Sequence, residues 1–171
     1  DLRPDRNGVL SYLVPEGFEG YVVLTSTAIE PAVVHLSGPV VEDTPDEEIL
    51  TFRLLFNGAP QLFANLLRLQ LEPDTVIAII SSLGCGQRQA AGSTVETTTQ
   101  TSSTSIVYVG NDLPDPSLSA TTENGNVALI NHPTGITTVR VRREGYTEPV
   151  AERRANFRPG AIHYMALPPT P

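Results

Sequence analysis

The stretch TTENGNVALINHPTGITTVRVRREGY, residues 121–146, decides the fold expected for this chain. It opens with the turn signal ENG at residues 123–125, because Asn and Gly both tolerate positive φ. A second turn signal, PTG, follows at residues 133–135. On either side of it, apolar residues alternate with polar or small ones, which is the period of a half-buried β-strand. We therefore predict a β-hairpin or β-meander that belongs to a β-sandwich.

This alternation assigns the side chains of each predicted strand to two faces. The first strand places Ala128 and Ile130 on one face and, on the other, Val127, Leu129 and Asn131. The second strand has an inward set made of Thr137, Val139 and Val141. Its opposite face carries Arg140 and Arg142, so the strand is expected to have a solvent side rich in arginine.

Length and charge limit the classes of protein to which the chain can belong. Its 171 residues suffice for one large domain or two small ones, and no apolar run approaches the roughly 20 residues that span a bilayer. Residues 1–75 hold twelve acids and four arginines, a net charge of −8, whereas residues 76–171 hold seven of each. This balance argues against nucleic-acid binding, which needs a basic face. Asp1 is not an initiator residue, so we expect a processed or excised chain.

The sequence carries no residue pattern typical of an enzyme, a metal site or a bound cofactor. His35, His132 and His163 are its only histidines, and no two of them have metal-ligand spacing. We expect His163 to be a packed or surface imidazole in the last strand and His132 to be exposed in a loop. Cys85 stands alone between glycines, so we expect a buried or inert thiol. We predict no catalytic, cofactor-binding or metal-binding residues.

The N-terminal segment, residues 1–58, echoes the central stretch. Turn signals NG and PEG within residues 7–17 match NG and PTG within residues 124–135, and the strand-like run YVVL follows at residues 21–24. Two generic hairpins would also explain the match, but we favour a duplicated unit because both turns and their order agree. The run AVVHL at residues 32–36 predicts one more strand.

An acidic cluster lies between this segment and the rest of the chain. It consists of Glu42, Asp43, Asp46, Glu47 and Glu48. Carboxylates this dense could bind Ca²⁺, but the Asp-x-Asp-x-Asp-Gly loop is absent and a charge run is usually a solvated loop. We interpret the cluster as a solvated segment.

A single helix is predicted within residues 59–74. Pro60 suits its first turn, Pro73 stops it, and Asn57 or Gly58 can cap it. Its apolar stripe would consist of Leu62, Phe63, Leu66, Leu67 and Leu71. A stripe of this width favours packing on a sheet, and binding of a partner is the alternative.

Further strands are predicted on both sides of the central stretch. The apolar runs are VIAIIS at residues 76–81, IVYV at residues 106–109 and IHYMAL at residues 162–167. The Ser- and Thr-rich residues 93–105 favour one or two exposed strands rather than a disordered stalk, because Thr is a good strand former. The chain ends in a stiff proline-rich tail at residues 169–171.

Turn motifs within residues 75–168 resemble those of a known family. They are AAGSTV at 90–95, ATTENG at 120–125, PTG at 133–135, REGY at 143–146 and PG at 159–160 before a closing strand. The pattern resembles the carboxypeptidase regulatory-like domain, a transthyretin-like β-sandwich, although Glu123 stands where that pattern usually has Asp. The resemblance implies a non-catalytic module of a secreted or cell-surface protein.

The predicted architecture is therefore mainly β. It is an Ig/transthyretin-like antiparallel β-sandwich at residues 75–168 with one short α-helix at residues 59–74, preceded by a partial second β-module at residues 1–58. The first module lacks the strands that would precede Asp1, and an exposed strand edge is costly. Three outcomes stay open: these strands are trimmed or missing, the N-terminal segment completes the second domain's sheets, or a neighbouring subunit donates strands.

Arginines concentrate near the predicted sandwich. Arg140 and Arg142 share one strand face, and we expect Arg153 to face them across a sheet. Cross-strand glutamates would balance such a face. Alternatively, the arginines form a docking patch for the acidic residues 42–48 of another copy, since complementary charges steer association.

These features predict a non-enzymatic extracellular structural or assembly protein. It would self-associate by β-strand addition into oligomers or filaments, because a head-to-tail contact of this kind propagates. The alternative is an accessory module of a larger secreted protein that binds a protein or carbohydrate ligand. The absence of Trp and the scarcity of aromatic residues weaken the carbohydrate version. No cofactor, nucleic acid or membrane span is predicted.

Overall fold

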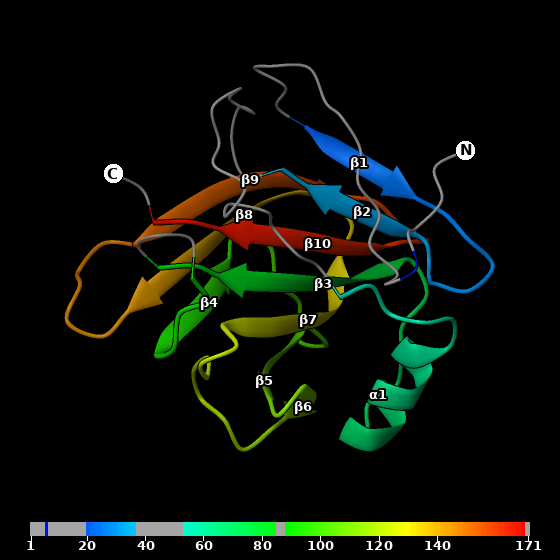
Figure 1. Cartoon of the computed structure of the whole chain (residues 1–171), viewed down its shortest axis with the longest axis horizontal. Coiled ribbons are helices and arrows are strands. Elements are labelled where there is room, and N and C mark those ends of the chain that lie inside the picture. The colour runs from blue at the N-terminus through cyan, green and yellow to red at the C-terminus, as the bar shows by residue number, and fades with distance from the viewer. Residues whose placement is uncertain (1–5, 7–19, 37–52, 85–87, 170–171) are drawn as a thin grey trace.

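Two β-sheets pack face to face in the computed structural model, which describes residues 6, 20–36, 53–84 and 88–169 (Figure 1). The larger sheet has the strand order β1-β2-β10-β3-β7-β5-β6, and the smaller has the order β4-β8-β9. The strands are β1 (Tyr21–Leu24), β2 (Ala32–His35), β3 (Thr75–Ser82), β4 (Ser93–Thr97), β5 (Ser105–Gly110), β6 (Leu113–Asp115), β7 (Asn126–Pro133), β8 (Gly135–Arg143), β9 (Ala151–Phe157) and β10 (Ile162–Leu167). One helix, α1 (Ala59–Leu67), lies beside the larger sheet.

The main core fills the space between the two sheets. Its residues alternate along each strand, so that Val127 and Leu129 of β7 face Val139 and Val141 of β8 across the core. Each fully buried aliphatic side chain stabilises the fold by about 1.5–3 kcal/mol relative to exposure. The predicted β-sandwich is confirmed. The larger sheet is mixed, however, because β10 pairs in parallel with both β2 and β3.

Strands of the N-terminal segment join the larger sheet. β2 pairs in parallel with β10, and β1 pairs antiparallel with β2. Ala32 and Val34 bury their side chains against Ile162 and Tyr164 of β10. The predicted boundary at residue 58 therefore does not separate two sheets, and these strands extend the sheet of the second predicted domain. The hairpin unit proposed for residues 7–17 lies outside the described residues, as does Cys85.

The central stretch is not a hairpin, which corrects the prediction from its alternation. β7 pairs with β3 and β5 in the larger sheet, whereas β8 pairs with β4 and β9 in the smaller one. Gly135, at φ 105°, follows the turn that carries the chain from one sheet to the other. β7 is also buried on both faces rather than half-buried. A strand buried on both faces belongs in the interior of a sheet, not at the edge of a two-stranded ribbon.

Helix α1 begins at the predicted residue, but it ends at Leu67 and not at Pro73, so Leu71 of the predicted stripe lies beyond the helix. Gly58 caps it with φ 87°, Pro60 lies in the first turn, and Arg68 ends it in the left-handed conformation at φ 55°. The predicted apolar stripe is only partly buried. Phe63 and Leu67 are half-buried, whereas Leu62 and Leu66 point into solvent with exposed fractions of 55% and 57%. Among the described residues, no helix has the length and apolar character needed to cross a membrane.

Candidate functional site

An apolar pocket of about 210 Å³ lies on the outer face of the larger sheet, next to α1. Its floor is formed by strand residues that point away from the main core: Ile77, Ile79, Val109, Ala128 and Ile130. Its walls come from α1, from the segment before it and from β6: Leu54, Leu55, Pro60, Phe63 and Pro114. Three polar residues complete the lining: Arg53, Asp112 and Asn126. The pocket is therefore an apolar hollow with polar groups at a few points, as ligand sites commonly are.

The apolar character of the pocket floor is explained by the sequence of the central strands. β3 reads as apolar on both faces, so Val76, Ala78 and Ile80 enter the main core while Ile77 and Ile79 face outward. Ala128 stands in register with Ile79 on one side and with Val107 on the other. Because alanine is smaller than both neighbours, its position leaves room above the sheet.

Hydrogen bonds fix the position of Leu54 and Leu55, the wall segment that precedes α1. The Leu55 N–H donates to the Tyr164 hydroxyl at 2.8 Å, and the Glu30 N–H donates to the Leu55 carbonyl at 3.0 Å. Burial raises the pKa of Tyr164 to about 12, so this hydroxyl stays neutral. The Gly58 N–H, at the start of α1, donates to Glu30 Oε1 at 2.7 Å. The wall and the helix are thus anchored to the sheet before any ligand arrives.

An exposed ion pair joins two parts of the pocket lining. Arg53 Nη1 lies 2.9 Å from Asp112 Oδ2, and the two side chains are 82% and 70% exposed. Asn111 and Asp112 form the tight turn between β5 and β6, with φ 50° and 63°, as a type I′ hairpin turn requires. An ion pair this exposed contributes at most about 1 kcal/mol, so a ligand can replace it at little cost.

Exposed apolar side chains belong to the same elements that line the pocket. Leu62 and Leu66 lie on α1, Phe56 precedes the helix, and Leu113 belongs to β6, which contacts α1. Each of these four side chains is more than half exposed. Single exposed leucines need no explanation, but several exposed apolar side chains on the elements that form an apolar pocket are typical of an interaction surface.

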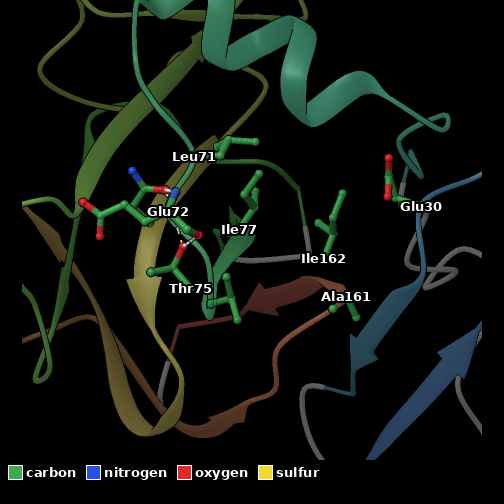
Figure 2. A pocket seen from close by; sticks show the side chains of 10 residues that line it. Glu30, Leu71, Glu72, Thr75, Ile77, Ala161 and Ile162 are labelled. Atoms are coloured by element: carbon green, nitrogen blue, oxygen red, sulfur yellow. Dashed lines mark hydrogen bonds between the residues drawn. The ribbon is translucent and has the colours of Figure 1, made fainter.

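A second pocket, also of about 210 Å³, opens where β3 begins and β10 begins (Figure 2). Asn131 at its edge has φ 55° and fixes the chain that follows α1: its Oδ1 accepts the Glu72 N–H at 3.0 Å, and its Nδ2 donates to the Gln70 carbonyl at 2.7 Å. Figure 2 shows Glu30 and Glu72 on opposite sides of the hollow, and both carboxylates already accept hydrogen bonds within the chain. These polar groups serve the fold, so the apolar pocket is the better candidate site.

The three histidines lie in one buried region, which the sequence did not indicate. His35 Nε2 and His163 Nδ1 are 2.9 Å apart, and the other His163 nitrogen contacts the backbone of Arg158. The Phe157 ring packs against all three imidazoles at centroid distances of 4.9 to 6.2 Å. The predicted exposure of His132 is wrong, because its ring is fully buried and bonds to Thr97 and Pro133.

Burial governs the protonation of these histidines. Burial, with smaller contributions from the nearby His163 and Arg153, lowers the pKa of His35 to about 4. Burial also lowers the pKa of His132 and of His163. All three imidazoles are therefore neutral at pH 7. Within the described ranges, no three His, Cys, Asp or Glu side chains gather as metal ligands would.

The predicted arginine patch is largely neutralised by neighbouring strands. Arg140 pairs with Glu152 of β9, and Arg142 Nε lies 2.8 Å from Glu96 of β4. Glu152 and Glu96 are thus the cross-strand glutamates that were expected to balance the arginine face. Arg153 does not face them, because it stands in register with Val139 on the inner side of the sheet. The acidic partners proposed for the docking patch, residues 42–48, lie outside the described part of the chain.

Comparison with known proteins gives no relative from which to assign a role. No family model, no curated protein and no solved structure matches this chain. The resemblance to carboxypeptidase regulatory-like domains thus stays a prediction based on turn motifs. The candidate site is therefore assigned from the geometry of the molecule alone.

Proposed function

We propose that this chain is a non-catalytic binding module that takes an apolar group of its partner into the pocket beside α1. One observation carries the proposal: an aliphatic hollow remains open on the outer face of the larger sheet, beside the segment from Leu67 to Leu71 that packs on the same face. An open apolar hollow loses the dispersion contacts that close packing supplies. A partner that fills it regains them.

The size of the pocket limits what it holds. A cavity of about 150 Å³ admits benzene, whereas pockets for whole drug-sized ligands measure about 300–1,000 Å³. At about 210 Å³, this pocket suits one aromatic ring or one branched aliphatic side chain. Its occupant is therefore an anchoring group of a larger partner. Such anchors, ringed by less buried contacts, commonly dominate the affinity of protein interfaces.

Two small probes test this proposal, toluene and p-cresol, monitored by NMR and by thermal shift. We expect saturable binding with Kd on the order of 1 mM, the range for ligands of so few atoms. Val109→Phe should fill the pocket and weaken binding at least tenfold, whereas Ile136→Phe, the same kind of change at an exposed position of the smaller sheet, should leave it unchanged. Equal binding by both variants, or no saturation, would overturn the proposal.

Self-association by β-strand addition is a second candidate, and one observation favours it. Within the described ranges, β1 is an edge strand with neither proline nor charge, and Tyr21 and Val23 are exposed. The other edges carry the features that block strand addition, such as Pro114 in β6 and Arg154 in β9. Light scattering tests this route: Val23→Lys should reduce the mass of any assembly that uses β1. An unchanged mass would exclude the β1 edge.

A further inference from the structure

We propose that the partner of the apolar pocket is a second copy of this chain, which inserts Tyr146 from its β8–β9 loop. The inference rests on the proposed binding function of the pocket and names its occupant. It differs from strand addition, because it joins a side chain to a pocket instead of extending a sheet.

The loop presents Tyr146 as a projecting anchor. Its side chain is 65% exposed, the highest fraction among the large hydrophobic residues that the structure describes. Gly145 has φ 85°, the Tyr146 N–H donates to the Arg143 carbonyl at 3.2 Å, and Arg142 Nη1 donates to the Thr147 carbonyl at 3.1 Å. Hydrogen bonds within the loop and to the end of β8 thus fix the conformation of the loop. Tyrosine loses little conformational entropy on binding, which suits it to this role.

The phenol group matches the pocket in size and polarity. A six-membered ring fits within about 210 Å³, as the smaller benzene cavity indicates. A buried tyrosine hydroxyl needs a hydrogen-bond partner, and Arg53, Asp112 and Asn126 offer such groups within the lining. The exposed leucines of α1 would then contact the rest of the loop.

The charges around the two elements are complementary. Glu144 and Glu148 flank Tyr146, and all residues from 144 to 148 are exposed. Arg53 lines the pocket, and Arg68 is exposed at the end of α1. Opposite charges of this kind steer two surfaces into register and respond to salt. Asp112 already pairs with Arg53, but both side chains are highly exposed and such a pair is weak, so a glutamate of the loop can replace Asp112 as the partner of Arg53.

Loop and pocket lie far apart on one molecule. In Figure 1 the β8–β9 loop extends at the left edge, whereas α1 lies at the right. A copy therefore cannot place Tyr146 in its own pocket. Joining two different surfaces gives a head-to-tail contact, which leaves a free loop at one end and a free pocket at the other. Such contacts build open chains or closed rings.

Complementation between two variants of the full chain tests the inference. Light scattering across a concentration series should show wild-type mass rising with concentration. Tyr146→Ser and Val109→Phe should each stay monomeric, and Ile136→Phe should associate like wild type. An equimolar mixture of the two monomeric variants should form 1:1 dimers, because one keeps a pocket and the other keeps a loop. Retained association of Tyr146→Ser, or no dimer in the mixture, would overturn the inference.

Charge reversal adds a second readout. Arg53→Glu should weaken association at least tenfold, and Glu144→Arg in the same chain should restore it. Absence of rescue would contradict the assigned orientation of the loop. The outcomes also separate the two proposals: binding of p-cresol to a chain that stays monomeric refutes the second-copy inference alone. Failure of p-cresol to bind refutes the pocket as a binding site and both proposals with it.

Discussion

The buried imidazole pair links two strands that enter the sheet from opposite ends of the chain. His35 belongs to β2 and His163 to β10, and their facing nitrogens share one proton at 2.9 Å. Tyr21 of β1 packs against His35 and lies under the Arg158 guanidinium at 4.9 Å. Two cations adjoin the pair, Arg153 and Arg158, so a protonated imidazole here meets positive charge as well as a poorly solvating interior.

This pair predicts a specific loss of stability in mild acid. The folded-state pKa of His35 is about 4 against an ordinary value of 6.5, so the unfolded chain binds more protons between these values. The free energy of unfolding therefore falls as the pH drops from 6.5 to 4, by an amount on the order of 3 kcal/mol from His35. Urea unfolding across this range measures it. His35→Phe should flatten the profile, and an equal slope in both chains would contradict the assignment.

At the scale of elements, the apolar stripe of α1 is divided between a side that packs on the sheet and a side that is exposed. Phe63 faces the pocket and Leu67 covers the sheet, whereas Leu62 and Leu66 contact solvent. Only the side with Phe63 and Leu67 therefore contributes packing to the fold. A helix whose leucines are all required for folding would bury them.

Substitutions on α1 distinguish these faces. Leu62→Gln and Leu66→Gln should each change the free energy of unfolding by no more than about 0.5 kcal/mol, because surface substitutions rarely do more. Ala64→Gln should cost at least about 2 kcal/mol, since Ala64 is fully buried. Chemical denaturation checks both values. Loss of stability in the leucine variants as large as that of Ala64→Gln would show that the outer face is part of the fold.

At the scale of the whole molecule, the larger sheet depends on strands from both ends of the chain. β10 lies between β2 and β3, so removal of the N-terminal strands turns an interior strand into an edge. It would also uncover Ile162 and Tyr164, which pack against Ala32 and Val34. Both consequences are unfavourable and promote aggregation.

A chain that starts at residue 59 tests this dependence. We expect it to aggregate or to lose its cooperative unfolding transition, whereas the full chain unfolds in one transition. Circular dichroism during heating and light scattering measure the two properties. Independent folding of the shortened chain with an unchanged midpoint would restore the predicted domain boundary at residue 58.

The structure confirms several predictions that were made from local sequence patterns. The strands at residues 76–81, 106–109 and 162–167 all form, and the alternation of β8 places Val139 and Val141 inward and Arg140 outward. The Ser- and Thr-rich residues 93–105 contribute β4, as their strand propensity predicted. The apolar pocket had a signal as well: strands that are apolar on both faces need cover on the outer face, and a single helix was available to provide it.

The sequence by itself determined where most strands and turns lie and where the helix begins, because side-chain period and turn chemistry act over a few neighbouring residues. Only the tertiary structure decided that β7 and β8 enter different sheets, that β2 lies beside β10, and that His35 meets His163. These pairings join residues far apart along the chain, up to 128 positions for the two histidines. Their selection depends on which apolar faces can be buried together, a property of the assembled sheets that no local pattern contains.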